Sequence, residues 1–188
     1  MSNTDEIEIK ASPSSDNVYV KLIDEYGRKL RLSAPNALTL GNLACGLFSL
    51  IMAMNGLHRF SALFIFIAAA CDFFDGRVAR MLGLTTKIGA QLDSLADVVS
   101  FGVAPTILAY SISQWSFFMI IAFFSFPLAG AWRLARFNVN PTEGHFIGLP
   151  IPAAGLTVAF LAIFSYVSPL IMIALAALMV SKIDVPKF

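Results

Sequence analysis

The sequence has few charged residues and almost no excess of either sign. Only 13% of its 188 residues are charged and the formal net charge is +1, whereas soluble domains carry about 25% charged residues. This balance excludes the strongly basic surface that is typical of nucleic-acid-binding proteins. Two cysteines are too few for a disulfide-stabilised scaffold. The small charged fraction also argues against an ordinary soluble domain.

Apolar residues make up 57% of the chain and include 17 phenylalanines, a composition that excludes intrinsic disorder. A membrane-spanning helix needs about 20 consecutive apolar residues, and an open sheet would leave backbone groups unpaired in lipid. We therefore expect an all-α integral membrane protein with six transmembrane helices. The six apolar stretches lie near residues 37–57, 61–81, 91–110, 114–137, 150–167 and 169–182.

A polar arm of residues 1–34 precedes the membrane domain of residues 35–188. The arm lacks the apolar core of a signal peptide, so we expect it to stay in the cytoplasm, partly disordered, with a short hairpin or an interfacial helix. If the arm is cytoplasmic, 12 of the 13 Lys and Arg residues fall on the cytoplasmic side and only Arg59 lies opposite. The positive-inside rule then places both termini in the cytoplasm, which agrees with an even number of spans.

Four aspartates lie where a passive helix bundle would have apolar residues. Asp72 and Asp75 come near the end of the second apolar stretch, and Asp93 and Asp97 near the start of the third. Their i,i+3 and i,i+4 spacings place each pair on one helix face. Unpaired carboxylates at membrane depth cost several kcal/mol, so we expect cations between them. Hard divalent ions such as Mg²⁺ or Mn²⁺ suit a site of carboxylate oxygens.

Two other interpretations of these acids are open. They are either solvated helix-end carboxylates neutralised by Arg77, Arg80 and Lys87, or the ion path of a divalent-cation transporter. Gly76 and Gly89 flank the acids and permit close approach of a phosphate or a second backbone. Arg80 adds a planar donor group suited to phosphate. Acids, glycines and an arginine together favour a metal–phosphate site.

The same residues form a spaced pattern that resembles the signature of the CDP-alcohol phosphatidyltransferase family. Every position of that signature is filled, in Asp72-x-x-Asp75-Gly76-x-x-Ala79-Arg80, then eight residues, then Gly89-x-x-x-Asp93-x-x-x-Asp97. The resemblance implies six membrane helices and transfer of a phosphatidyl group from a CDP-linked lipid to an alcohol, with release of CMP. Residues 93–105, 133–138, 146–155 and 178–183 are similar to the phosphatidylserine synthase branch, which implies L-serine as the acceptor. Another alcohol acceptor stays open as the alternative within the family.

The resemblance also implies roles for individual residues. Asp72, Asp75 and Asp93 match the positions that bind the metals, which the resemblance implies to be a pair of Mg²⁺ or Mn²⁺ ions, and Asp97 completes that site. Asp97 also matches the position of the general base, which takes the proton from the attacking hydroxyl. The nucleotide-contacting positions match Gly76, Ala79 and Arg80, and Gly89 permits close packing or ligand approach.

Other polar residues are candidates on chemical grounds. Thr39 and Asn42 stand i,i+3 near the start of the first span and either donate to the nucleotide phosphate or bond to neighbouring helices. Arg133 and Arg136 end the fourth span and are either interfacial anchors or cations for the serine carboxylate, with Asn138 as a further candidate. The family resemblance implies a homodimer. The apolar stretches do not distinguish an ester-linked from an ether-linked CDP-lipid.

Overall fold

The structure of the chain is a computed structural model that describes residues 36–82, 86–113, 116–139, 145–181 and 184–186. The N-terminal arm expected from the sequence lies outside the described residues. Six helical stretches make up most of the described part, and each corresponds to one of the six apolar stretches. In chain order they are the N-terminal helix Asn36–Met54, α2 (His58–Leu82), a continuous segment of α3 (Lys87–Asp97), the π-helix η1 (Val98–Val103) and α4 (Ala104–Ile112), then α5 (Phe117–Val139), α6 (Ile151–Ile163) and α7 (Pro169–Val180).

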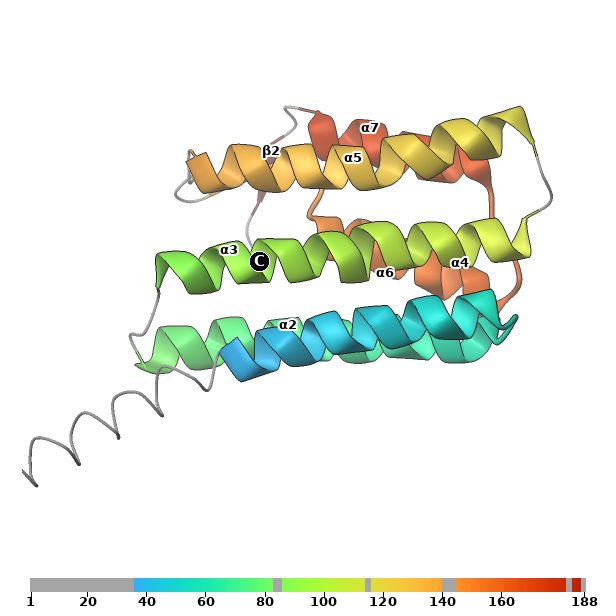
Figure 1. The fold of residues 1–188 in the computed structure, drawn as a ribbon. Coiled ribbons are helices and arrows are strands. Elements are labelled where there is room, and N and C mark those ends of the chain that lie inside the picture. The colour runs from blue at the N-terminus through green and yellow to red at the C-terminus, as the bar shows by residue number, and fades with distance from the viewer. Residues whose placement is uncertain (1–35, 83–85, 114–115, 140–144, 182–183, 187–188) are drawn as a thin grey trace, which may run out of the picture.

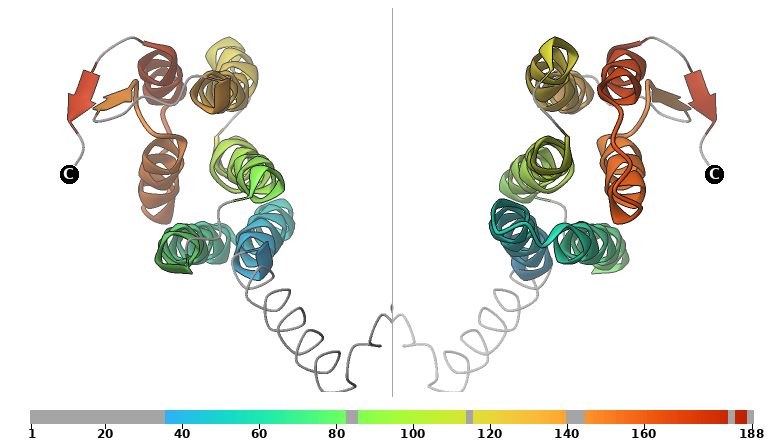
Figure 2. Two further views of the ribbon diagram at one scale, coloured as in Figure 1. Left: turned by 90° about the vertical axis from the view of Figure 1, so that its left-hand side faces the viewer. Right: turned by 90° about the vertical axis from the view of Figure 1, so that its right-hand side faces the viewer.

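The helices run side by side along one axis (Figure 1). Viewed end-on they form two rows, with the N-terminal helix, the α3–α4 segment and α5 in one row and α2, α6 and α7 in the other (Figure 2). Consecutive helices alternate in direction, so the end of α2, the start of α3 and the end of α5 come together with the start of the N-terminal helix (Figure 1). We call this the acid-bearing end of the bundle.

The distribution of side-chain sizes is that of a bundle in lipid. Small residues fill the interior: Ala62, Ala68 and Ala96 are fully buried. Many large apolar side chains face outward, including Phe117, which is 73% exposed, although Phe101 and Phe126 are fully buried. At Gly155 in α6, an added Cβ would lie 2.6 Å from the backbone oxygen of Phe101 in η1. Small residues thus let the backbones approach closely, the usual basis of helix packing in membranes.

Helix length and composition identify a multi-pass membrane protein. Three helices of the described part are long and apolar enough to cross a membrane: Asn36–Met54, Ile88–Ile112 and Phe117–Val139. Helix α2 has 25 residues, but two aspartates and two arginines interrupt its second half. Helices α6 and α7 are apolar but have only 13 and 12 residues, so each rises about 20 Å against a hydrocarbon core of roughly 30 Å.

Helix α6 ends earlier than the apolar stretch near 150–167 led us to expect. Ser165 adopts a left-handed backbone with φ 54°, which terminates the helix. The amide of Tyr166 donates to the Leu161 carbonyl at 3.2 Å, and that of Ser165 donates to the Ala162 carbonyl at 2.9 Å. These two hydrogen bonds form a Schellman-type C-cap, so apolar residues beyond Ile163 belong to the turn.

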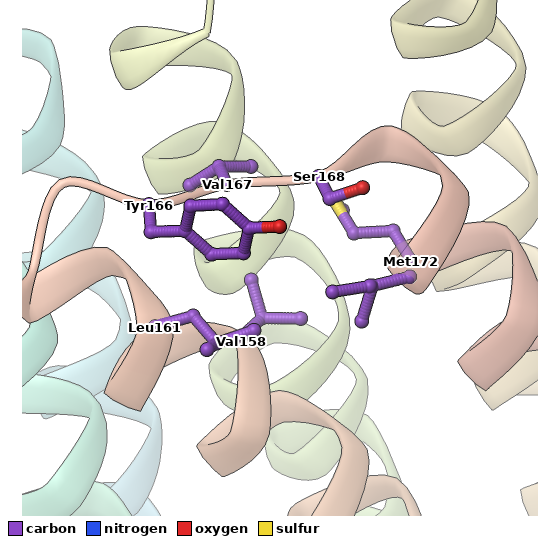
Figure 3. Close-up of a pocket in the computed structure, with 7 residues that line it drawn as sticks. Val158, Leu161, Tyr166, Val167, Ser168 and Met172 are labelled. Carbon is purple, nitrogen blue, oxygen red and sulfur yellow. The ribbon is translucent and has the colours of Figure 1, made fainter.

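The α6–α7 turn also lines a small pocket at the far end of the bundle from the acids. Tyr166, Val167 and Ser168 of the turn meet Val158 and Met172 of the two helices there (Figure 3). Its lining is almost wholly apolar, and it contains no acid, lysine or arginine. This pocket therefore has none of the groups that phosphate or metal chemistry needs.

The all-α expectation needs one addition. Two three-residue strands, β1 (His145–Ile147) and β2 (Asp184–Pro186), pair antiparallel, with Phe146 opposite Val185. Gly148 follows β1 with φ 77°, and an added Cβ there would lie 3.0 Å from the Ser181 carbonyl oxygen. This close approach links the segment before α6 to the end of α7.

Candidate functional site

Three of the four predicted acids converge at the acid-bearing end. Asp72 and Asp75 of α2 and Asp93 of α3 each offer a carboxylate oxygen, and these oxygens lie within 4.8 Å of one another. The i,i+3 spacing puts Asp72 and Asp75 on one face of α2, and the antiparallel run of α3 brings Asp93 to the same depth. Asp75 is only 4% exposed, and the other two are half-buried.

Asp97 lies one helical turn beyond Asp93 and is 6% exposed. It is not part of the three-acid cluster, but it lies close enough to Asp72 and Asp93 for their charges to act on its carboxylate. It is the last residue of α3, and the helix continues from it directly into η1. Asp97 therefore faces the same site from deeper along the α3–α4 segment.

The N-terminal helix contributes donors to two of these acids. Thr39 Oγ1 donates to Asp75 Oδ2 at 2.9 Å, and Asn42 Nδ2 donates to Asp97 Oδ1 at 3.2 Å. Of the two roles that the sequence left open for Thr39 and Asn42, the structure thus shows bonds to neighbouring helices. A contact between either residue and a nucleotide stays a prediction.

The donor set of the cluster fits a divalent cation. All of its ligands are carboxylate oxygens, which suit Mg²⁺ and Mn²⁺. Asp93 Oδ1 is buried and has no hydrogen-bond partner among the residues that the structure describes. Such an oxygen is costly unless a cation or a donor completes it. Asp72, Asp75 and Asp93 are therefore suited to hold the metal that the sequence predicts.

Two arginines near the cluster, Arg77 and Arg133, have different surroundings. The guanidinium of Arg77 lies over the ring of Phe73, 5.8 Å from its centroid, so it contacts an aromatic face. Arg133 of α5 is 6% exposed and interacts electrostatically with Asp97. Arg133 Nε is buried without a hydrogen-bond partner in the described part of the chain. Arg133 is thus a buried donor beside the acids with capacity to bind an anion.

Arg136 and Asn138 make contacts within the chain. Arg136 Nη1 and Nη2 lie 3.5 Å from the carbonyl oxygens of Val180 and Ser181, which joins the end of α5 to the end of α7. Asn138 Nδ2 donates to Ser94 Oγ at 2.9 Å. Both contacts are structural. A role of Arg136 and Asn138 at the serine carboxylate stays a prediction.

The two signature glycines have different surroundings. At Gly76 an added Cβ would meet nothing within 4 Å, whereas at Gly89 it would lie 3.0 Å from Thr86 Oγ1 and 3.2 Å from Asn36 Oδ1. Gly89 therefore permits close packing of α3 on the start of the N-terminal helix. Space beside Gly76 is open for a ligand. The side chains of Ala79 and Arg80 lie outside what the structure describes.

The sequence analysis missed Ser100 and Gly46. Ser100 Oγ donates to the backbone oxygen of Asn42 at 3.0 Å, and an added Cβ at Gly46 would lie 3.0 Å from Ser100 Cα. Ser100 follows Asp97 by three residues, so the helical spacing already placed it beside the acid face. That spacing was the available signal.

Comparisons with known proteins identify the family of the chain. Residues 32–181 match the model of a family described as CDP-alcohol phosphatidyltransferase. The chain is 40% identical to the CDP-diacylglycerol–serine O-phosphatidyltransferase of Bacillus subtilis, over 82% of this chain and 90% of that protein. It is 41% identical to a protein of the same name from Methanocaldococcus jannaschii, over 80% and 72%. It is 36% identical to the archaetidylserine synthase of Methanothermobacter thermautotrophicus, over 83% and 70%.

Proposed function

Because the chain belongs to the CDP-alcohol phosphatidyltransferase family, we propose that it transfers a phosphatidyl group from a CDP-linked lipid to the hydroxyl of L-serine and releases CMP. The observation that carries this proposal is the convergence of Asp72, Asp75 and Asp93, with oxygens within 4.8 Å, in the family's acid signature. Relatives that cover most of the chain bear the names of serine transferases. The relative named archaetidylserine synthase keeps an archaetidyl donor open beside a phosphatidyl donor.

Asp72, Asp75 and Asp93 would hold Mg²⁺ or Mn²⁺, and we propose two ions, with Asp97 completing the site. Metal ions at such a site neutralise the pyrophosphate and stabilise the leaving group. The three carboxylates come from two helices, and their oxygens lie within 4.8 Å of one another. They therefore concentrate negative charge at one place. No other cluster of acids, histidines or cysteines with such spacing occurs among the described residues.

Asp97 is our candidate for the general base. It accepts the proton of the serine hydroxyl while the hydroxyl oxygen forms a bond to the lipid-side phosphorus. The bond from that phosphorus to the bridging oxygen breaks, and CMP leaves with the bonding electrons. The position of Asp97 supports this role, because it is buried and faces the cluster but lies outside the three acids that share the tightest contact.

We assign the CDP moiety to the open space beside Gly76. Among the described residues, an added Cβ at Gly76 meets nothing within 4 Å, so packing against that part of the protein does not require a glycine there. Close approach of a ligand does require it. By the family signature, Ala79 and Arg80 extend this nucleotide-binding face, and Gly89 keeps α3 close to it.

Arg133 is the residue that we propose for the serine carboxylate. It is 6% exposed, lies near Asp97 and has a buried Nε without a partner in the described part of the chain. A guanidinium binds a carboxylate through two parallel hydrogen bonds. The hydroxyl of a serine held in this way would be directed toward Asp97. Arg136 and Asn138 would support this face from the end of α5.

We further propose six membrane spans with the acid-bearing end in the cytoplasm. The charge bias of 12 Lys and Arg residues to one supports this orientation, and both substrates' polar groups are then reached from inside the cell. The short helices α6 and α7 span by packing against longer neighbours. We also propose a homodimer, as the family resemblance implies.

The test of the proposed function is CMP release by the purified full chain with CDP-lipid and a panel of alcohols. L-serine should give CMP at a rate far above glycerol 3-phosphate, inositol phosphate or water. Omission of the divalent ion should stop release. Turnover with another alcohol and none with serine would overturn the acceptor assignment but leave the family chemistry in place.

A further inference from the structure

We propose that the N-terminal helix positions the site acids: Thr39 and Asn42 each hold one carboxylate oxygen and so set which oxygen faces the metal and the substrate. This inference rests on the proposed function for the meaning of the site, but its contacts are independent of it. It assigns to Thr39 and Asn42 an action through the acids, distinct from the direct nucleotide contact that the sequence suggested.

One face of the N-terminal helix contacts acids on two other helices, α2 and α3. Thr39 and Asn42 stand one turn apart, so their side chains leave the same face. Thr39 Oγ1 donates to Asp75 Oδ2 of α2 at 2.9 Å. Asn42 Nδ2 donates to Asp97 Oδ1 of α3 at 3.2 Å. Each contact therefore ties one oxygen of its acid to the N-terminal helix.

Water cannot easily replace these donors. Thr39 is 4% exposed, Asn42 0%, Asp75 4% and Asp97 6%. Removal of either donor leaves a buried carboxylate oxygen without that hydrogen bond, which is costly, and the side chain can then turn toward another cation or donor. Hydrogen bonds of this kind orient metal ligands, and their loss typically weakens metal affinity about 10–100-fold.

A second contact fixes the position of Asn42 itself. Ser100 Oγ donates to the Asn42 backbone oxygen at 3.0 Å. Ser100 lies in η1, which begins directly after Asp97. Gly46, one turn beyond Asn42, permits this approach, because an added Cβ would lie 3.0 Å from Ser100 Cα. The same helical segment therefore carries Asp97 and anchors the residue that holds it.

The two donors should affect different steps. Asp75 belongs to the three-acid cluster that fits the metal, so Thr39 should set metal affinity. Asp97 lies outside the tightest cluster and is our candidate base, so Asn42 should set turnover. A misplacement of about 1 Å in a reacting group costs roughly 100-fold in rate.

The experiment compares Thr39→Val, Thr39→Ser and Asn42→Leu in the purified full chain. Mn²⁺ binding is measured from the electron paramagnetic resonance signal of free Mn²⁺, without substrate. Thr39→Val should raise the Mn²⁺ dissociation constant about 10–100-fold, and Thr39→Ser should restore it. Asn42→Leu should raise the Mn²⁺ dissociation constant much less than Thr39→Val does, but lower kcat about 10–100-fold at saturating Mn²⁺ and serine.

The matched control is Ser49→Ala. Ser49 Oγ lies 2.9 Å from Ser61 Oγ and joins the N-terminal helix to α2 in the buried interior, but it touches no acid. Ser49→Ala should leave Mn²⁺ affinity and kcat unchanged. If it shifts Mn²⁺ affinity as much as Thr39→Val does, the effect is one of helix packing and the proposal is wrong.

Two further outcomes decide the proposal. Unchanged Mn²⁺ affinity in Thr39→Val together with unchanged kcat in Asn42→Leu would overturn it. If Thr39→Val does not purify as a folded protein, Thr39→Ala removes the same donor with less bulk. An unmodified chain that binds Mn²⁺ but releases no CMP with serine would refute the proposed function, while the Thr39 comparison would still test the positioning of Asp75.

Discussion

The side-chain amide of Asn42 lies 3.2 Å from the carboxylate of Asp97, although 55 residues separate them in the chain. Both residues are buried. The contact joins the start of the first helix to the point where α3 passes into η1. The N-terminal helix therefore takes part in the acid-bearing end, although only α2 and α3 carry the acids.

The first prediction concerns the metal. Asp93→Asn should abolish turnover, and excess EDTA should do so reversibly. Without metal, removal of one of several close negative charges relieves repulsion, so the unfolding temperature of Asp93→Asn in EDTA should equal or exceed that of the unmodified chain. Thermal unfolding and CMP release measure the two effects. Full turnover in excess EDTA would contradict a metal-dependent mechanism.

The second prediction separates Asp97 from the other acids. If Asp97 is the base, Asp97→Asn should lower kcat roughly 10²–10⁴-fold, the usual contribution of proton transfer. Affinity for the CDP-lipid should fall much less than in Asp72→Asn. Steady-state kinetics and CDP-lipid binding on the same proteins test this. Equal loss of CDP-lipid binding in both variants would identify Asp97 mainly as a metal ligand.

The third prediction concerns recognition of serine. Arg133→Ala should raise the KM for serine, because loss of a buried carboxylate contact costs about 2–4 kcal/mol. Arg133→Lys keeps the charge but loses the planar pair of donors, so its KM should be intermediate. Arg136→Ala should raise this KM less, since its guanidinium lies at the Val180 and Ser181 carbonyls. A KM unaffected by both Arg133 substitutions would place the carboxylate elsewhere.

The fourth prediction uses two glycines of opposite surroundings. Gly76→Ala should leave the unfolding temperature unchanged or higher, since a Cβ there meets nothing within 4 Å and alanine favours helix by about 1 kcal/mol. It should nevertheless raise the KM for CDP-lipid. Gly155→Ala should destabilise the fold, because its Cβ would lie 2.6 Å from the Phe101 backbone oxygen. An unchanged CDP-lipid KM in Gly76→Ala would remove the nucleotide from this face.

The fifth prediction concerns orientation. In a chain whose two cysteines are replaced by alanine, Ser113→Cys and Lys187→Cys probe opposite faces of the membrane. Impermeant thiol reagent added to intact cells should label position 113 and spare position 187, since 12 of the 13 Lys and Arg residues are expected inside. The reverse labelling would place the acid-bearing end outside.

The sequence predicted the acid cluster because helical spacing alone puts Asp72 beside Asp75, and consecutive antiparallel spans bring Asp93 to the same depth. It did not predict the acceptors of Thr39 and Asn42. An i,i+3 pair shows that two side chains share a face but not which helix that face meets. The pairing with Asp75 and Asp97 depends on how the first helix packs on α2 and η1.

Three features of the fold could not be predicted from the local sequence pattern. The end of α6 at Ile163 depends on the left-handed backbone of Ser165. A glycine at this position would have indicated a helix end, but a serine does not. The π-helix η1 has no distinctive composition in its apolar sequence. The pairing of Phe146 with Val185 joins segments far apart in the chain, and its register follows from the packing of α6 and α7.

The central claim is that the serine hydroxyl attacks the lipid-side phosphorus, and the fate of its oxygen tests that claim most directly. The purified chain is given CDP-lipid, Mn²⁺ and L-serine labelled with ¹⁸O in the hydroxyl, and the products are weighed by mass spectrometry. The label should appear in the serine-containing phospholipid, and CMP should carry none. A labelled ester between serine and the nucleotide, together with an unlabelled lipid phosphate, would contradict it. Release of CMP without any labelled phospholipid would also contradict it.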